Sequence, residues 1–164
     1  MLRVLGLCLV ILTPASGQAL TIPNVLPGAE LRGEAVLRLF GFPLYRARLY
    51  TETGAPLNWD QDFGLELTYM RDLSRQDLAE STMRELERIG GAIPIRDQLN
   101  RCYADVRRGD RIAAVSQGQN QIAFWLNGTR TCTLSHPQIK SRFMAIFLGD
   151  NTRSRSFTRK LKGE

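Results

Sequence analysis

The spacing of apolar residues changes several times along this chain, and the order of those changes constrains its fold more than any other feature of the sequence. Apolar residues recur with a period of two from Glu34 to Tyr50, with a break at Phe40-Gly41-Phe42-Pro43, and again from Leu65 to Met70. A period of two is typical of strands that bury one face. The pattern therefore predicts two strands joined by a turn, followed by a third strand.

The period then changes to that of a helix. From Ser74 onward apolar residues recur every three or four positions, which predicts an amphipathic helix that ends at Gly90-Gly91. Ser74 and Asp77 have the spacing of a capping box. In this motif the side chain of each residue accepts a hydrogen bond from the backbone N–H of the other at the start of the helix. After Pro94, a second and shorter helical stripe extends from Ile95 to Val106.

A second block of strands and a third helix follow. Strands are expected at Ile112–Ser116, Gln121–Leu126 and Thr129–Leu134, and Asn127-Gly128 between the last two is a strong hairpin signal. The third helix is expected from His136 to Leu148. Strands and helices that alternate in blocks predict an α+β fold, with a largely antiparallel sheet and the helices gathered on one face. The 164 residues have room for one domain.

The N-terminus has the layout of a secretory signal peptide. Arg3 precedes an apolar run over residues 4–12, and small residues follow it. The run is shorter than the roughly 20 apolar residues of a membrane span. Cleavage after Gly17 or after Ala19 fits the small-residue rule, so we expect a signal peptide over residues 1–19 and an exported protein, periplasmic or secreted, with one domain over residues 20–164. A buried first helix and a lipid-modified Cys8 are the alternatives.

Cysteine usage agrees with export. Removal of Cys8 leaves Cys102 and Cys132, and an even pair in an exported protein suggests a disulfide bond. Two buried free thiols are the alternative. One histidine and three cysteines are too few for a zinc cluster, and no cofactor motif is present, so neither a metal nor a cofactor is expected.

Cationic residues lie beside aromatic residues on the predicted strands. The chain has 22 Lys and Arg against 16 Asp and Glu, a formal net charge of +6. Guanidinium groups next to aromatic rings can bind a carboxylate while apolar neighbours contact a hydrophobic tail. A solvent-exposed sheet face is the alternative. The residues in this pattern are Arg38, Arg46, Arg48, Tyr50, Tyr69 and Arg71.

Several short motifs follow one another in an order that is similar to a known family. They are Leu37–Gly41, Tyr45–Tyr50, Leu65–Asp72, Arg88–Gly90, Gly109-Asp110, Asn127-Gly128 and Ile146–Gly149. This ordered set resembles the bacterial chalcone isomerase-like proteins, in their exported branch. The resemblance implies an open-faced β-sandwich, in which a curved antiparallel sheet is layered with helices around a cleft. It agrees with the α+β fold that the periodicity predicts.

The resemblance also implies which residues face that cleft. The family includes plant enzymes that close a chalcone to a flavanone, fatty-acid-binding relatives and noncatalytic members. The plant arginine corresponds to Arg32, with Arg38 as a competing alignment, and the plant strand threonine falls near Tyr45. The plant helix tyrosine and asparagine correspond to Leu78 and Glu85, so neither is preserved. We therefore expect no chalcone isomerase activity, while an apolar cleft with an arginine remains.

Two hypotheses about function follow from these residues. The first is a noncatalytic, exported protein that binds a small amphipathic anion such as a fatty acid, with Arg32 or Arg38 on the carboxylate. The second is an intramolecular lyase or isomerase of unknown substrate that uses Tyr45 or Tyr69 as acid or base. The candidate ligand-binding residues are Arg32, Arg38, Tyr45, Arg46, Arg48, Tyr69 and Arg71.

The basic tail over residues 151–164 suggests a third hypothesis, an envelope-associated protein whose tail contacts anionic lipid or a partner. The alternative is a final helix that packs Phe157 and Leu161, four residues apart, onto the domain. Nucleic acid is not an expected partner, because export removes it and no stacking platform with interleaved cations is present. The cations of the tail are Arg153, Arg155, Arg159, Lys160 and Lys162.

Overall fold

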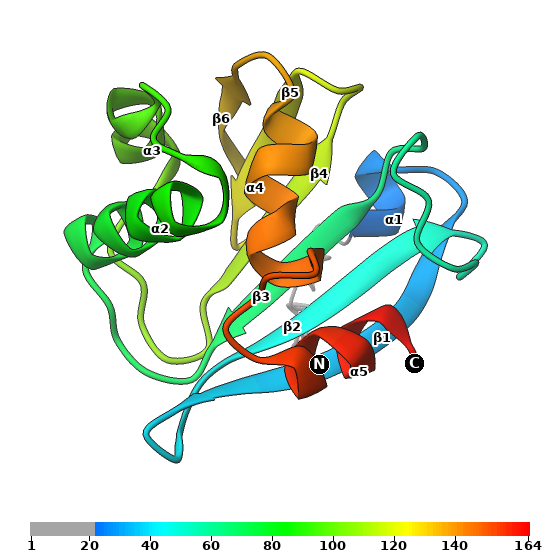
Figure 1. The fold of residues 1–164 in the computed structure, drawn as a ribbon, viewed down its shortest axis with the longest axis horizontal. Helices are drawn as coiled ribbons and strands as arrows, with labels where there is room; N and C mark the ends of the chain where they lie inside the picture. The colour runs from blue at the N-terminus through cyan, green and yellow to red at the C-terminus, as the bar shows by residue number, and fades with distance from the viewer. Residues whose placement is uncertain (1–21) are drawn as a thin grey trace, which may run out of the picture.

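The computed structural model describes residues 22–164, whose fold is shown in Figure 1. Within these residues six strands form one antiparallel sheet, in which each strand pairs with the next along the chain. The sheet is open, with β1 and β6 at its two edges. The strands are β1 (Ala29–Leu39), β2 (Phe42–Glu52), β3 (Gly64–Tyr69), β4 (Arg111–Ser116), β5 (Gln121–Leu126) and β6 (Thr129–Ser135).

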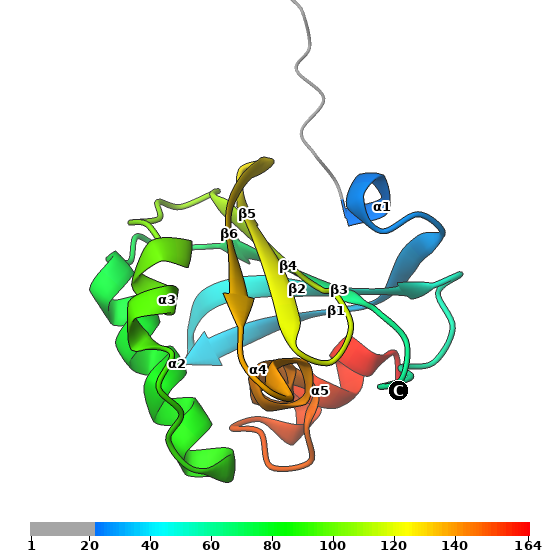
Figure 2. The ribbon, with the colours of Figure 1, turned by 90° about the horizontal axis from the view of Figure 1, so that it is seen from above.

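Helices cover one face of this sheet. The described residues form α1 (Ile22–Val25), α2 (Arg75–Gly90), α3 (Arg96–Cys102), α4 (Ile139–Leu148) and α5 (Arg155–Lys162). Figure 2 shows α2 to α5 on one side of the sheet and α1 on the other. The helices predicted to share one face do so, whereas α1, which the periodicity did not indicate, covers a small second cluster around Val115 and Trp125. No helix in residues 22–164 is long and apolar enough to cross a membrane.

The strands differ from the predicted ones mainly at the first hairpin. β1 begins at Ala29, five residues before the predicted start, and Leu39 pairs with Phe42, so the turn consists of Phe40 and Gly41 alone. Along β2, Ala47 is buried while its neighbour Arg46 is half-exposed, as the period of two predicts.

The start of α2 confirms the predicted capping box. The Ser74 hydroxyl accepts a hydrogen bond from the Asp77 backbone N–H at 3.1 Å, and the Asp77 carboxylate accepts one from the Ser74 backbone N–H at 3.2 Å. These bonds satisfy groups that a helix end otherwise leaves unpaired. The later helices are shorter than predicted, since α3 ends at Cys102 and α4 begins at Ile139.

A disulfide bond joins the end of α3 to β6. Cys102 and Cys132 are bonded, with 5.0 Å between their Cα atoms and a sequence separation of 30 residues. The predicted pairing is confirmed, and the alternative of two free thiols is wrong. In the chain-entropy estimate, closing a loop of this length stabilises the fold by roughly 3 to 4 kcal/mol.

The C-terminal segment forms a packed helix rather than a free tail. Ser154 caps α5, and both Phe157 and Leu161 are buried against the sheet. The prediction of a final helix is confirmed. The predicted signal peptide lies outside the described residues and stays a prediction.

Candidate ligand-binding site

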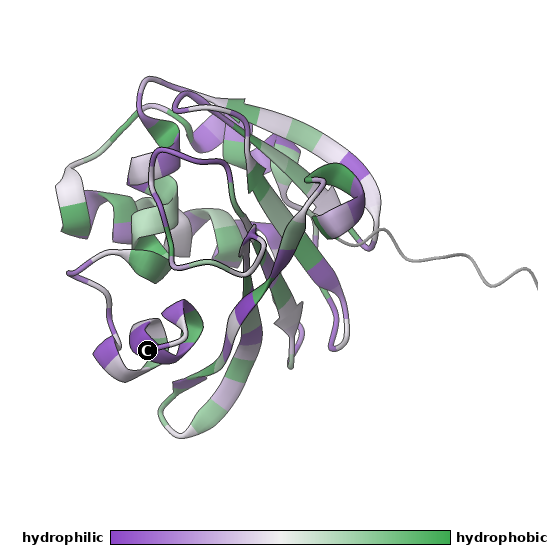
Figure 3. Cartoon of the chain, turned by 90° about the vertical axis from the view of Figure 1, so that its right-hand side faces the viewer, coloured by the Kyte–Doolittle hydropathy of each residue, from purple (hydrophilic) through white to green (hydrophobic). Residues whose placement is uncertain are grey.

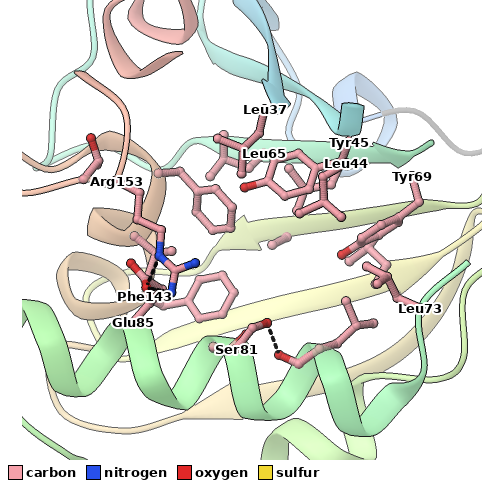
Figure 4. A pocket seen from close by; sticks show the side chains of 18 of the residues that line it. Leu37, Leu44, Tyr45, Leu65, Tyr69, Leu73, Ser81, Glu85, Phe143 and Arg153 are labelled. Atoms are coloured by element: carbon pink, nitrogen blue, oxygen red, sulfur yellow. Dashed lines mark hydrogen bonds and ion pairs between the residues drawn. The ribbon is translucent and has the colours of Figure 1, made fainter. Parts of the chain in front are cut away.

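A cavity lies between the sheet and the helices that cover it. Its volume is about 140 Å3, and it is lined by β1 to β5, by α2 and α4, and by the segment that leads into α5. Figure 4 shows side chains from these elements converging on it. The lining is mostly apolar and includes Leu37, Leu44, Leu65, Leu67, Phe143 and Phe147.

Three tyrosines line the wall of this cavity. The rings of Tyr45 and Tyr69 pack edge to face with their centroids 6.1 Å apart, and the Tyr103 hydroxyl is 3.1 Å from the Thr82 hydroxyl, with which it shares a hydrogen bond. Figure 4 shows the hydroxyls of Tyr45 and Tyr69 on the cavity side of their rings. These two hydroxyls are therefore available to a polar group of a ligand.

Burial raises the pKa of all three cavity tyrosines. Desolvation raises the pKa of Tyr103 to about 12, although its hydrogen bond with Thr82 opposes the change. Desolvation also raises the pKa of Tyr69 well above its ordinary value of 10.0, and it is the main cause of the raised pKa of Tyr45, which the charge of Arg153 opposes. The hydroxyls stay protonated at neutral pH, so they can donate hydrogen bonds but are poor bases.

One end of the cavity is charged. Glu85 of α2, with a side chain only 8% exposed, accepts hydrogen bonds from Arg88 at 2.8 and 3.1 Å on one carboxylate oxygen, and from Arg153 on the other. Arg153 lies in the segment before α5, lines the cavity and keeps 52% of its side chain exposed. Two guanidinium groups share one carboxylate, so this end carries a net positive charge of the kind that attracts a carboxylate.

The position of α5 depends on two residues of β1. The Arg32 Nε donates a hydrogen bond to the Lys162 carbonyl at 2.8 Å, at the end of α5 where helix carbonyls favour a cation. A Cβ atom at Gly33 would lie 2.5 Å from the Leu161 carbonyl oxygen, so only glycine allows the helix to approach this closely. Arg32 thus holds α5, which supplies Phe157 to the cavity wall, and does not itself line the cavity.

The other arginines of the predicted site lie away from the cavity. Arg46 and Arg48 lie on the same face of β2, as the alternation predicts. That face is the one opposite the helices, and both side chains pair there with Glu34. Arg38 donates to the Gly41 carbonyl in the β1–β2 turn at 3.2 Å, and Arg71 is exposed after β3. The structure therefore brings Tyr45 and Tyr69 together at the cavity and places none of these four arginines there.

Sequence reasoning missed Arg153 as a residue of this site. The sequence analysis counts Arg153 among the cations of the basic tail, whereas in the structure its guanidinium pairs with Glu85 of α2. A signal for Arg153 was available in the sequence. Phe157 and Leu161 are four residues apart after Ser154, which predicts a packed helix, and packing of that helix brings Arg153, the residue before Ser154, toward the core. The two positions that correspond to the plant helix tyrosine and asparagine, Leu78 and Glu85, both line the cavity.

An open antiparallel sheet whose helix-covered face encloses an apolar cavity defines an open-faced β-sandwich with a cleft of ligand size. Residues 14–163 match the family described as chalcone isomerase-like, and the chain belongs to this family. The resemblance inferred from the ordered motifs is confirmed, while the bacterial and exported branch stays a prediction.

The fold is similar to that of a solved plant protein. The crystal structure of the fatty-acid binding protein AtFAP1 from Arabidopsis thaliana is similar with a TM-score of 0.63, over 84% of this chain and 88% of that chain, at 12% sequence identity. At this identity the similarity concerns the fold alone. The predicted open-faced β-sandwich is confirmed. No curated protein matches the chain.

Proposed function

We propose that this chain is a noncatalytic, exported protein that binds a small amphipathic anion, such as a short fatty acid, in the cavity between the sheet and α2, α4 and α5. The observation that carries the proposal is the guanidinium of Arg153 at the polar end of a cavity lined mostly by apolar side chains. A single cation at one end of an apolar cavity is suited to a ligand with one charged group and a hydrophobic tail.

The size of the cavity limits the ligand. About 140 Å3 is close to the volume of an engineered core cavity, roughly 150 Å3, that accommodates benzene. The cavity therefore fits a single ring or a short acyl chain without rearrangement. The chain shares its fold with AtFAP1, which is a fatty-acid binding protein, and this similarity favours an acyl chain over other apolar groups as the ligand.

The polar groups give the ligand an orientation. Arg153 pairs with Glu85, which Arg88 also neutralises, so a ligand carboxylate can share the guanidinium without leaving Glu85 unpaired. The hydroxyls of Tyr45 and Tyr69 can donate hydrogen bonds to the same ligand. In this orientation the hydrophobic tail lies beside Leu65, Phe143 and their apolar neighbours.

The tyrosines argue against the alternative of a lyase or isomerase. A general base works best when its pKa lies near the working pH, and burial moves the pKa of Tyr45 and Tyr69 in the opposite direction. Leu78 and Glu85 cannot replace the plant tyrosine and asparagine that orient water and stabilise the attacking oxygen. Turnover of a substrate that Tyr69→Phe abolishes, with binding retained, would favour the enzyme over the binding protein.

Calorimetric titration with octanoate and with octanol tests the proposal. We expect octanoate to bind, and we expect Arg153→Gln to weaken it about ten- to a hundredfold, since hydrogen bonds to charged groups contribute about 1.5 to 3 kcal/mol. Octanol binding should change much less. Arg155→Gln is the matched control, because Arg155 is exposed and lies outside the cavity. Failure of both compounds to bind would exclude the proposed function.

A further inference from the structure

The tip of the β1–β2 hairpin exposes large apolar side chains. Phe40 is 91% exposed, Phe42 is 72% exposed and Leu39 is 41% exposed. The tip projects from the lower end of the molecule, beyond the helices that cover the sheet (Figures 1 and 3). Contiguous exposed apolar side chains on a soluble domain mark a surface for contact with another molecule.

The backbone at this tip is unfavourable for a phenylalanine. Phe40 and Gly41 form a two-residue turn with φ values of 50° and 84°, a conformation that favours asparagine followed by glycine. The β5–β6 turn of the same chain has nearly the same values, 50° and 87°, and is formed by Asn127 and Gly128. A third pair with positive φ values, Thr53 and Gly54, follows β2 and does not join two paired strands. Of the two hairpin turns with this conformation in residues 22–164, one therefore has the expected asparagine and the other has a phenylalanine.

The two turn residues also differ in what their side chains contribute to the fold. Asn127 accepts a hydrogen bond from the Arg111 backbone N–H and donates one to Asp110, each at 2.9 Å. The ring of Phe40 is almost fully exposed and therefore contributes little to folding. An aromatic side chain held in a strained conformation without internal packing indicates a function outside the fold.

Exposed cations occur at the same end of the molecule. Arg155, Arg159 and Lys160 project from α5, and none of the three forms an ion pair within residues 22–164. Figures 1 and 3 both place α5 and the hairpin tip at the lower end. Glu164 is the one acidic residue among residues 151–164, so the charge of this segment is strongly positive.

We propose that the hairpin tip and α5 dock the protein onto an anionic phospholipid bilayer. The rings of Phe40 and Phe42 enter the interface, where aromatic side chains are favoured, and the cations of α5 contact the headgroups. The turn consists of two residues, so the tip is small enough to insert between lipids. Net positive charge near the surface complements the negative potential of such a membrane.

Docking in this way brings the cavity close to lipid. Leu37 and Leu44, which line the cavity, belong to the same two strands as the tip, and Leu37 is three residues from Phe40, about 10 Å along a strand. A bilayer is a source of amphipathic anions, so this inference adds a source of ligand to the proposed function. The docking itself rests on the tip and α5 and needs no ligand in the cavity.

Vesicle binding by Phe40→Asn tests the inference. The substitution introduces the residue that Asn127 supplies at the equivalent turn, so we expect unchanged or higher stability in urea unfolding. Cosedimentation with mixed phosphatidylglycerol–phosphatidylcholine vesicles should fall at least about tenfold, because one aromatic side chain no longer enters the interface. All variants share residues 1–21, so any contribution of these residues is common to them.

A charge substitution supplies the second arm. Arg155→Gln should weaken binding to the mixed vesicles about fivefold and leave the weaker binding to pure phosphatidylcholine vesicles unchanged. Arg101→Gln on α3, which removes one exposed cation far from the tip, is the matched control and should have no effect.

Three results would overturn the inference. They are no vesicle binding by the unsubstituted protein, equal binding by Phe40→Asn, and a concentration-dependent dimer in sedimentation velocity that Phe40→Asn abolishes, which would assign the tip to a second copy. Octanoate titration of Phe40→Asn without vesicles separates this inference from the proposed function. It should match the unsubstituted protein whether or not the tip binds lipid.

Discussion

The Glu85 carboxylate accepts hydrogen bonds from Arg153, so the segment that leads into α5 is tied to the middle of α2 at the polar end of the cavity. The same carboxylate also pairs with Arg88, whose guanidinium donates to the Asn151 carbonyl at 2.8 Å. One buried acid therefore fixes both the position of Arg153 and the path of the chain toward α5. This arrangement lets the effects of charge on binding and on stability be separated.

Glu85→Gln should affect stability and ligand affinity in opposite directions. Loss of the carboxylate leaves Arg88 and Arg153 without their ionic partner, and we expect the free energy of unfolding to fall by about 1 to 3 kcal/mol. Octanoate affinity should rise several-fold, because the guanidinium of Arg153 is released and a like charge is removed. Urea unfolding and calorimetry measure the two effects, with Glu87→Gln, an exposed position on the same helix, as the control. Loss of octanoate binding in a folded Glu85→Gln protein would mean that Arg153 binds the ligand only while the Glu85 carboxylate holds it at the cavity.

Affinity should depend on chain length in a way set by the cavity volume. Each methylene buried among the apolar side chains contributes about 0.8 kcal/mol, so affinity should increase about fourfold per carbon along a series of linear carboxylates. The increase should stop once about 140 Å3 is filled. Calorimetry from butanoate to hexadecanoate measures this dependence. If affinity increased continuously up to hexadecanoate, the cavity would have to enlarge when the ligand binds, which contradicts a volume limit of this size.

Gly33→Ala should displace α5. The added methyl group would lie 2.5 and 2.6 Å from the carbonyl oxygens of Leu161 and Lys160, and backbone atoms cannot move aside as a flexible side chain can. We expect a loss of about 1 to 3 kcal/mol in the free energy of unfolding and faster hydrogen exchange of α5 amides. Amides of β5, far from this contact, serve as the internal control. Unchanged exchange in α5 would mean that the helix is held by other contacts.

Alkaline titration should show the buried tyrosines. Because the folded-state pKa values of Tyr45, Tyr69 and Tyr103 lie above the ordinary value of 10.0, their contribution to stability is complete below pH 10 and is lost as the pH rises through those raised values, about 12 for Tyr103. Absorbance titration should therefore detect at most Tyr50 before the protein unfolds. Reversible ionisation of three or more of the four tyrosines near pH 10, with the fold intact, would contradict the buried placement.

The sequence predicted the fold well because most elements bury one face and therefore have a clear period. The alternation in β2, the capping box at Ser74 and the Asn127-Gly128 turn are local patterns with local physical causes, and each appears in the structure as predicted. α1 has four residues, too few to show a helical period, and it was not predicted. The early start of β1 was missed because residues 29–33 combine exposed and buried positions around a bulge.

The site was predicted only in part, for a different reason. Alternation separates the two faces of a strand but does not say which face the helices cover, so Arg46 and Arg48 were grouped with a site on the opposite side of the sheet. The charged end of the cavity joins Glu85 and Arg153, which are 68 residues apart, and no local pattern reports such a contact. The role of Arg32 could not be predicted for the same reason, because it depends on a hydrogen bond to the carbonyl of Lys162, which is distant in the sequence.

A crystal structure of the protein with octanoate bound tests the central claim most directly. We predict the carboxylate within hydrogen-bonding distance of the Arg153 guanidinium and the alkyl chain between the sheet and α4, in contact with Leu65 and Phe143. An unoccupied cavity with octanoate bound elsewhere, or a chain in the cavity with its carboxylate remote from Arg153, would contradict the account.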